Sequence, residues 1–460
     1  MRALHRAKNG SLGDMERLPP TYDGQEINKL PRFWPKRFFY GWVIVFISFW
    51  DSMLTAGIQS YGFSVFLPVL SNHFGWSRGA ISAVQLIRMV TTMIAAVFLG
   101  RFADQRHGPR YMMIAGGTVA GLSLILLSRM QTLWQFYVLF GVVFGVAMTA
   151  LGGMILGPTI VSKWFIRKRG RALAIATMGV SAGGVVAIPL TRFFIDAFGW
   201  RLAWTALGIV MLTTIIPLGA IFMRRQPEDV GLLPDNDSDD EISAPIQGRQ
   251  DTSRASALTI RGSFTARQAF KSHSLWILVV VQTLGSLALS PVLMHQIAYM
   301  QDKGMNPLTA AFIGTLVAFF AMVGKVPWGI LAEHLHVRFV IAIAFTIAGS
   351  SLWLLTQAND QFMMYIAYSI FFGLSMGSMP PLNNLMWVSY FGRDNLGRIR
   401  GYVTPLTRWT GGFSPLFAGF MWDKVGNYDL AFTVFSLSWI TAGLVVLFAG
   451  NPKEPEAASE

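Results

Sequence analysis

The sequence contains two related stretches of eight residues: Gly100-Arg101-Phe102-Ala103-Asp104-Gln105-Arg106-His107 and Gly329-Ile330-Leu331-Ala332-Glu333-His334-Leu335-His336. In both copies an acid follows the glycine after four positions and a histidine after seven, and the copies are 229 residues apart. A second repeat has nearly the same offset: a Gly-Gly pair followed by a proline occurs at 183–189 and again at 411–415. The chain therefore contains two similar halves, a plan that is common among membrane transporters.

The composition is that of a membrane protein. Of the 460 residues, 53% are hydrophobic and only 13% are charged, about half the charged share of a typical soluble domain. A soluble core could not enclose 35 Phe, 15 Trp and 23 Met with so few polar residues to cover it, whereas lipid requires no polar cover. The absence of cysteine excludes a disulfide scaffold and any thiolate metal or redox site.

Twelve apolar stretches are long enough to cross a bilayer, which takes about 20 residues of helix. We therefore expect an all-α membrane protein with twelve transmembrane helices in two pseudo-symmetric six-helix halves. The expected spans are 40–70, 78–99, 110–128, 133–161, 171–198, 201–222, 274–299, 307–332, 339–357, 361–390, 398–422 and 429–449.

These spans divide the chain into five segments. They are an N-terminal tail at 1–39, an N-terminal half at 40–222, a linker at 223–273, a C-terminal half at 274–449 and a C-terminal tail at 450–460. The linker has no apolar period and carries an acidic patch at Asp235, Asp237, Asp239, Asp240 and Glu241. We expect a flexible connection that ends in a short helix near 265–271, and a regulatory role for it stays open.

The basic residues indicate the orientation in the membrane. Lys and Arg number 37 against 24 Asp and Glu. The two tails and the even-numbered connections between spans hold 28 of the 37 Lys and Arg residues, and four lie inside spans. The opposite side holds five: Arg78, Arg129, Arg201, Lys303 and Lys424. Because basic residues gather on the cytoplasmic side, we expect both termini there. The net charge of +13 is then a signal of topology and not of nucleic-acid binding.

The two-half plan and the loop at 100–110 resemble the major facilitator superfamily. In that family the loop between the second and third spans usually runs Gly, three residues, Asp, a basic residue, Gly and further basic residues. Here Gln105 stands where the first basic residue is usual, and Gly108 comes one place late. The resemblance implies the fold of this superfamily and a role for the loop in holding the outward-open state.

We accordingly expect a conformational gate at this loop and at its repeat. Asp104 at the cytoplasmic rim can interact with the positive N-terminal end of a neighbouring helix, and the arginines can bridge to acidic or carbonyl partners. Such contacts would form in one conformation and break in the other, and a simple topology anchor is the alternative. The predicted gate residues are Gly100, Asp104, Arg106, Arg110, Gly329 and Glu333.

Four short motifs are similar to the monocarboxylate transporter and oxalate/formate antiporter group. They occur in the expected order, as Tyr40-Gly41-Trp42, Gly75-Trp76-Ser77, Trp164-Phe165 with the basic run that ends at Gly170, and Gly199-Trp200-Arg201. Span five lacks the Gly-Pro step that is common in drug/proton antiporters. A multidrug/proton exporter is therefore a weaker alternative.

Two cations and two amides predict an anion site in the C-terminal half. Lys325 lies eight residues before Glu333, and Arg408 lies eight residues after Arg400, so both are expected about 12 Å from the cytoplasmic rim. Asn383 and Asn384 fall at a similar depth. No acid in these spans neutralises the cations, so each is expected to bind a carboxylate oxygen of the substrate. The alternative is a side chain that extends to the cytoplasmic surface.

The family resemblance adds to this prediction and also limits it. Oxalate/formate antiporters similarly carry a basic residue in span eight and another in span eleven, and monocarboxylate transporters carry one in span eight. Monocarboxylate transporters also place an Asp four residues before that position, where this chain has Ala321. Their basic residue near the end of span one is missing as well. Gln59 and Tyr61 in span one are further candidates to line the cavity.

Asp51, Arg88 and His295 are candidates for proton coupling or charge relay. Asp51 and Arg88 lie at similar depths in spans one and two and could form a permanent ion pair. Alternatively, Asp51 could accept a proton and release Arg88 toward the substrate. His295 near the end of span seven could relay protons from outside, or could make an ordinary polar contact.

The sequence as a whole predicts a secondary transporter for a small organic anion, a monocarboxylate or short dicarboxylate, that works by alternating access. Coupling to protons is favoured over exchange of the oxalate-formate type, which stays open. A membrane sensor is a weaker alternative, because it would need a folded output domain and the linker is too short and polar for one. An enzyme is not indicated, because the sequence contains no catalytic motif. We expect no cofactor and no metal, a monomer, and a location in the plasma (cytoplasmic) membrane.

Overall fold

A computed structural model describes residues 21–22, 25–26, 39–103, 105–151, 156–166, 168–236, 264–358, 361–392 and 395–450. Apart from a two-residue antiparallel pair, β1 (Thr21–Tyr22) with β2 (Gln25–Glu26), the regular elements in these ranges are helices.

The first half of the chain forms long helices that run back and forth through one bundle. Its elements are α1 (Gly41–Ala56), the π-helical turn η1 (Gly57–Gly62), α2 (Phe63–Phe74), α3 (Arg78–Ala103), α4 (Gly108–Leu127), α5 (Leu133–Phe136), η2 (Tyr137–Val143), α6 (Phe144–Leu151), α7 (Leu156–Trp164), α8 (Arg169–Pro217) and η3 (Leu218–Phe222). The bundle packs around aromatic rings, and Phe66 stacks on Trp204 with ring centroids 3.8 Å apart.

The second half forms a bundle of the same kind. Its elements are α11 (His273–Asp302), α12 (Pro307–His334), α13 (Val337–Thr356), α14 (Phe362–Gly377), α15 (Met379–Phe391), α16 (Leu396–Val425), α17 (Asp429–Val445) and the 3₁₀ turn η8 (Val446–Phe448). The start of α12 shows why the sequence begins a helix there. Asn306 accepts hydrogen bonds from the amides of Leu308 and Thr309, at 2.8 and 3.1 Å, and Pro307 fills the first helical position.

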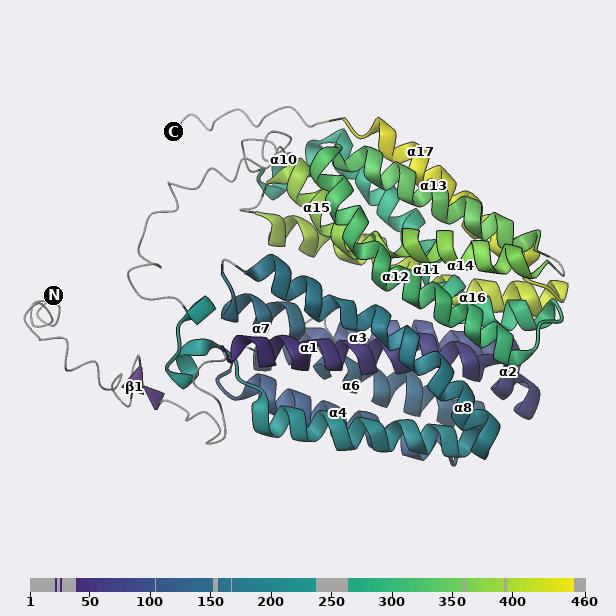
Figure 1. Cartoon of the computed structure of the whole chain (residues 1–460), viewed down its shortest axis with the longest axis horizontal. Coiled ribbons are helices and arrows are strands. Elements are labelled where there is room, and N and C mark those ends of the chain that lie inside the picture. The colour runs from purple at the N-terminus through teal and green to yellow at the C-terminus, as the bar shows by residue number, and fades with distance from the viewer. Residues whose placement is uncertain are drawn as a thin grey trace, which may run out of the picture.

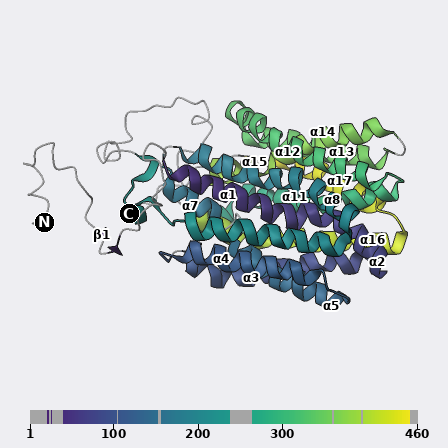
Figure 2. The same ribbon diagram turned by 60° about the horizontal axis from the view of Figure 1, so that its bottom comes forward.

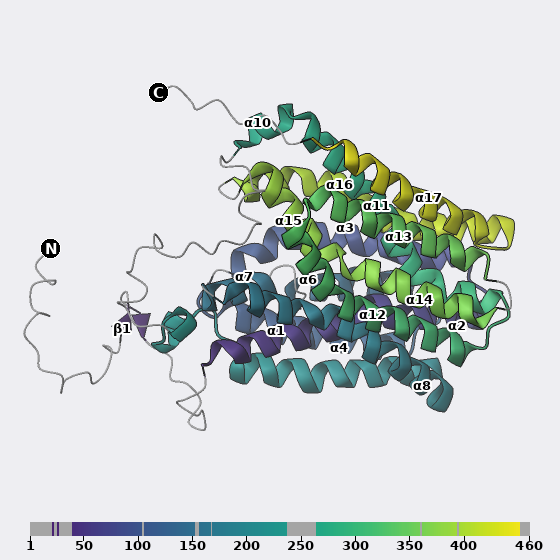
Figure 3. The ribbon, with the colours of Figure 1, turned by 45° about the horizontal axis from the view of Figure 1, so that its top comes forward.

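The two bundles lie side by side along their length (Figure 1). Among the described residues, the main contacts between the bundles are those of α3 with α16, α8 with α12, and α2 with α11. We call the end at which α3 begins and α11 and α16 end the distal end, and the end at which α4 and α11 begin the proximal end. Figure 2 shows α2 at the distal end and α7 toward the proximal end, and Figure 3 also shows α10 (Ala266–Lys271) toward the proximal end.

Ten helical segments in the described part of the chain are long and apolar enough to cross a membrane, against twelve expected spans. One segment, Arg169–Phe222, is 54 residues long and covers two expected spans. It is interrupted only at Gly199, which has φ 79° and ψ 164°, between the expected fifth and sixth spans. The expected eleventh span corresponds to α16, which has 30 residues but is too rich in Gly, Thr, Pro and charged residues to count among the ten.

The outward surfaces of the helices are strongly apolar. Val97 is 66% exposed, Phe193 60% and Trp353 55%, on helices from both halves. A soluble protein rarely shows so much contiguous apolar surface. Together with the ten apolar helices, this surface is that of an integral membrane protein.

The linker is described at its two ends, and residues 237–263 lie outside the described ranges. Its first part folds back as two 3₁₀ turns, η4 (Pro227–Val230) and η5 (Pro234–Asn236). Asp235 is buried and accepts a hydrogen bond of 2.7 Å from the amide of Ile166. Asp235 thus binds the turn before α8, and the flexibility of the linker stays a prediction. At the other end α10 (Ala266–Lys271) is a short helix where one is predicted, capped by Thr265.

Candidate functional site

Lys325 on α12 reaches across to the other half of the molecule. Its Nζ donates a hydrogen bond of 2.8 Å to the main-chain oxygen of Thr177 on α8. The side chain is half-buried, and within the described ranges no acid forms an ion pair with it. Lys325 and Thr177 stand nine and eight residues from the proximal ends of their helices, a depth of about 12 to 14 Å. This lysine thus points between the halves and not into lipid.

The other predicted anion-binding groups lie on the neighbouring helices. Asn383 on α15 is half-buried, and its Oδ1 accepts a hydrogen bond of 3.1 Å from the indole of Trp387. Asn384 lies on the same helix and Arg408 on α16, but both side chains are outside the described residues. Since α15 contacts α12, the structure joins the helix of Asn383 to that of Lys325. A convergence of Arg408 on the same place stays a prediction.

Tyr61 lies where the two halves touch. It is 1% exposed, and its hydroxyl has no hydrogen-bond partner among the described groups. A Cβ added at Gly184 would lie 2.8 Å from the Tyr61 ring and 2.5 Å from the Cβ of Ala318 in the other half. Gln59, which is half-buried, accepts a hydrogen bond of 3.0 Å from Arg88 at its main-chain oxygen.

Asp51 and Arg88 do not form an ion pair in this structure. Arg88 donates to the main-chain oxygen of Gln59 and to Oε1 of Gln85, and its guanidinium lies 5.5 Å from the ring centre of Phe140. Asp51 is 5% exposed, and its Oδ1 has no hydrogen-bond partner in the described part of the chain. The permanent ion pair, one of the two predicted possibilities, is thus not formed here. Burial of a carboxylate oxygen without a hydrogen-bond partner costs free energy, and protonation of Asp51 would reduce that cost. Asp51 therefore stays a candidate for proton coupling.

His295 is completely buried and lies in a contact between the halves. Its Nε2 is 3.1 Å from the main-chain oxygen of Pro415 and 3.2 Å from Oγ of Ser82 on α3. Because a carbonyl oxygen only accepts, Nε2 carries a proton. Nδ1 then accepts from the hydroxyl of Tyr428 at 2.9 Å when the ring is neutral. Of the two predicted roles, the polar contact is present, and a proton relay stays a prediction.

His295 belongs to a larger set of polar groups that joins the distal ends of the two halves. Arg78 is at its centre: Nη1 and Nη2 donate to the two carboxylate oxygens of Asp302 at 2.6 and 2.7 Å, and Nη1 donates to the Tyr428 hydroxyl at 3.1 Å. The indole of Trp422 also donates to Asp302, at 2.8 Å. We call the following residues the distal cluster: Arg78, Ser82, His295, Asp302, Asp423 and Tyr428.

Of this cluster, the sequence predicts only His295 as a functional residue. Arg78 is among the five basic residues expected on its side of the membrane, and neither Asp302 nor Asp423 belongs to a predicted site. The available signal was a cation and two acids, each next to a predicted helix end on one side. Charges at helix ends are common on exposed loops, however, and the sequence does not say that these helix ends meet.

The predicted gate residues lie at the proximal ends of α3, α4 and α12. Gly100 on α3 and Gly329 on α12 have nothing within 4 Å of an added Cβ. Asp104 and the side chain of Glu333 are outside the described residues. Arg106 and Arg110 line a cavity with other arginines and form no ion pair in the described part of the molecule. The gate itself stays a prediction.

A local pair of opposite charges lies within α8. On α8 the Nε of Arg192 donates to Oδ2 of Asp196 at 2.7 Å, one helical turn away. The described residues contain no group of three or more His, Asp or Glu that could hold a metal ion.

Comparison with known proteins agrees with this architecture. The family model described as the Major Facilitator Superfamily matches residues 41–295 and, in a second match, 275–460. A solved structure of a bacterial homologue of the human lysosomal transporter Spinster, inward-facing and unoccupied, superimposes with a TM-score of 0.65 at 14% identity, over 90% of this chain and 96% of that one. At this identity the structural likeness shows the fold alone.

Several curated relatives are monocarboxylate transporters. Monocarboxylate transporter 13 of Rattus norvegicus is 23% identical over 89% of this chain and 88% of its own length. Human monocarboxylate transporter 2 is 23% identical over 91% of this chain and 89% of its own length. These matches confirm the predicted resemblance to the superfamily and to its monocarboxylate transporter group. The relatives are transporters and not enzymes, as expected for this chain.

Proposed function

Because the chain belongs to the Major Facilitator Superfamily, we propose that it is a secondary transporter that carries a small organic anion, a monocarboxylate or short dicarboxylate, by alternating access. We further propose twelve spans, with α8 and η3 crossing twice around Gly199 and α16 crossing once. Both termini would then be cytoplasmic. The protein would lie in the plasma membrane and act as a monomer.

The position of Lys325 is the main reason to propose an anionic substrate. It is a cation about 12 to 14 Å inside the bundle, and among the described residues it donates a hydrogen bond to a neutral carbonyl of the opposite half. A charged group at this depth requires a partner, and a substrate carboxylate is a stronger acceptor than a carbonyl oxygen. We infer that substrate binding moves Lys325 from Thr177 to the carboxylate, and that Arg408 contributes a second cation.

The contacts between the halves support a state that is closed at the distal end. Outward of Lys325 the halves meet at Gly184 with Ala318 and, at a similar depth, at Gly412 with Met89. Farther out they meet at the distal cluster. A substrate site at Lys325 would therefore open toward the proximal, cytoplasmic side.

Proton coupling is our preferred mechanism, and anion exchange is the alternative. Asp51 is the buried acid with an unpartnered oxygen in the N-terminal half, and it supplies a group that can take up a proton. His295 is a second titratable group, but it is held in the distal cluster. Its hydrogen bonds would break when the distal end opens, so it would reach the outer solution only in the other state.

A transport assay with the purified full-length chain in liposomes tests both proposals. Uptake of labelled lactate, pyruvate, oxalate and succinate is measured against protein-free liposomes, with and without internal anion and with and without a pH gradient. Symport predicts that a pH gradient alone drives uptake. Exchange predicts uptake only when the liposomes contain anion.

Lys325→Gln tests the anion site itself. Loss of a charged hydrogen bond costs about 1.5 to 3 kcal/mol, so we expect the apparent affinity for the carried carboxylate to fall roughly 10- to 100-fold. Lys271→Gln, at the exposed end of α10, is the matched control and should leave uptake unchanged. Equal uptake by the Lys325 variant and the wild type would contradict the proposal, as would transport of cations in place of carboxylates.

A further inference from the structure

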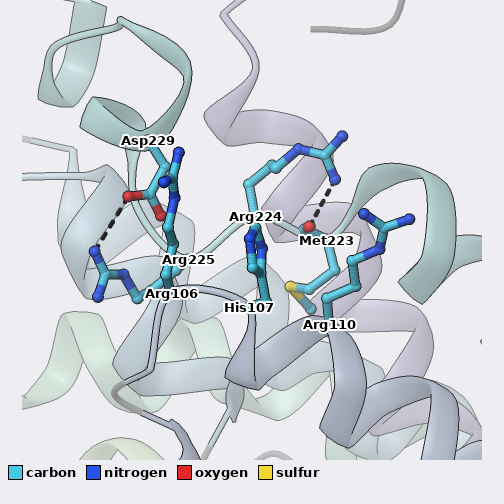
Figure 4. Close-up of a pocket in the computed structure, with 7 residues that line it drawn as sticks. All are labelled: Arg106, His107, Arg110, Met223, Arg224, Arg225 and Asp229. Carbon is cyan, nitrogen blue, oxygen red and sulfur yellow. Dashed lines mark hydrogen bonds and ion pairs between the residues drawn. The ribbon is translucent and has the colours of Figure 1, made fainter. Parts of the chain in front are cut away.

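A cavity at the proximal end of the N-terminal half is rich in arginine. It lies between the start of α4 and the segment that follows η3, and Figure 4 shows the side chains around it. Its volume is about 70 Å³, several times the roughly 10 to 15 Å³ that one water requires. The lining residues are Arg106, His107, Arg110, Met223, Arg224, Arg225 and Asp229.

The positive charge around this cavity is only partly neutralised. Four arginines line it and Asp229 is the acid among the lining residues. Asp229 is already engaged, since its Oδ1 accepts a hydrogen bond of 3.1 Å from Arg225, one turn earlier in the chain. The guanidinium groups of Arg106, Arg110 and Arg224 therefore form no ion pair with an acid among the residues that line the cavity.

The hydrogen bonding is also incomplete. Arg224 donates from Nη1 to the main-chain oxygen of Met223 at 2.8 Å. The Nε atoms of Arg106 and Arg224 are buried, and neither has a hydrogen-bond partner among the described residues. Buried N–H groups of this kind are normally satisfied. The unused donors and the unbalanced charge occur on the same side chains.

Arg224 shows the electrostatic consequence. Burial lowers the pKa of its guanidinium, the nearby Tyr40 acts in the opposite direction, and the positive charge of Arg110 lowers it further. Arg110 comes from α4 and Arg224 from the segment after η3, so two cations from different elements are held near each other. An anion between them would relieve this repulsion.

We propose that this cavity is a binding site for a phosphate-class oxyanion. Planar guanidinium groups donate paired hydrogen bonds that match phosphate oxygens, and several arginines around one cavity are typical of phosphate recognition. The source of the phosphate group is either free phosphate or a lipid headgroup. The second is available because the cavity lies where α4 begins and η3 ends, at the level of the membrane surface.

The site is separate from the proposed transport path. All of its lining residues belong to the N-terminal half and the start of the linker, and none lies at the contact with the C-terminal half. Occupation would tie the start of α4 to the segment at 223–229. The proposal therefore does not depend on the identity of the transported substrate.

Binding to the purified full-length protein tests the proposal in two arms. In the first, thermal unfolding in detergent is followed as inorganic phosphate is added, with chloride at equal ionic strength as the reference. In the second, the same measurement is made in nanodiscs of phosphatidylcholine with and without phosphatidic acid. We expect a rise of the midpoint by about 3 °C or more in at least one arm. A rise in the first arm identifies free phosphate, and a rise in the second alone identifies the headgroup.

Arg224→Gln should weaken the binding roughly tenfold or more, and Arg224→Lys should weaken it less because the charge remains. Arg267→Gln removes an exposed cation from α10 at the same end and should bind like the wild type. The proposal is overturned if the wild type responds to neither anion source, or if Arg224→Gln and Arg267→Gln respond equally. The wild-type titrations decide the matter even if Arg224→Gln does not fold.

Discussion

Asp423 caps the first turn of α3 from the opposite half of the molecule: its Oδ1 accepts a hydrogen bond of 2.9 Å from the amide of Arg78, and its Oδ2 accepts one of 2.8 Å from Gly79. The first amides of a helix have no partner within that helix, and a carboxylate interacts favourably with the positive end of the helix. Arg78 meanwhile binds Asp302 through its side chain. One residue of the N-terminal half therefore holds two acids of the C-terminal half.

Arg78→Gln should open the distal end. The variant leaves Asp302, whose side chain is 28% exposed, without its ion pair, and loss of a charged hydrogen bond costs about 1.5 to 3 kcal/mol. A shift of that size changes the ratio of closed to open molecules roughly 10- to 100-fold. Spin labels at Asn72→Cys and Lys424→Cys, both exposed near the distal end, report the change as a longer distance. The chain has no native cysteine that would take up label.

Arg129→Gln is the control for this experiment, because Arg129 is an exposed cation after α4 with no part in the distal cluster. It should leave the distance distribution unchanged. An unchanged distribution in Arg78→Gln would mean that the polar contacts do not determine the closed state.

Gly184→Ala should separate the halves at their middle. An added Cβ would lie 2.5 Å from Ala318 and 2.8 Å from the ring of Tyr61, well inside van der Waals contact. Such overpacking costs about 1 to 3 kcal/mol. We expect the same spin-label pair to show a larger population at long distance.

Gly411→Ala is the matched control, because nothing lies within 4 Å of its added Cβ. Both variants gain the same helix propensity, so a difference between them reports the contact alone. Equal distance distributions would show that the Gly184 contact is not tight in the protein.

Asp51→Asn should retain the fold and be at least as stable as the wild type. The change removes a buried carboxylate whose Oδ1 has no partner, and the cost of leaving such a group unsatisfied is about 1 to 3 kcal/mol. Asp229→Asn is the contrast, because Asp229 is also buried but binds Arg225, and its loss should destabilise the protein. Thermal unfolding at neutral pH compares the two variants.

If Asp51 carries the coupled proton, uptake by the Asp51→Asn variant will no longer respond to a pH gradient, whereas counterflow will remain.

Gly199→Ala should destabilise the junction between the expected fifth and sixth spans. At φ 79° and ψ 164° the residue occupies a region of the backbone map that is essentially restricted to glycine, so alanine should cost about 1 to 3 kcal/mol. Gly170→Ala, inside the first turn of α8 with nothing within 4 Å, should be neutral or slightly stabilising. Unfolding midpoints of the two variants that agree within error would contradict this explanation of the break.

The sequence alone determined the membrane character, the repeated halves and the family. These features depend on quantities that are local along the chain: the length of apolar runs, the spacing of Gly100 and Gly329 with their acids, and a few short motifs. The same local signals gave the depth of Lys325, because a helix advances about 1.5 Å per residue whatever lies beside it. The i, i+4 pair of Arg192 and Asp196 was predictable for the same reason.

Only the tertiary structure decided which side chains face each other. Lys325 contacts Thr177, 148 residues earlier in the chain, and Arg78 contacts Asp423, 345 residues later. Arg88 binds Gln59 and Gln85, although Asp51 lies at a similar depth. Depth along a helix does not give its rotation or its neighbours, and both are set by how the helices pack within and between the two bundles. Packing within the N-terminal bundle also brings Arg110 and Arg224 to one cavity, which their separation along the chain does not predict.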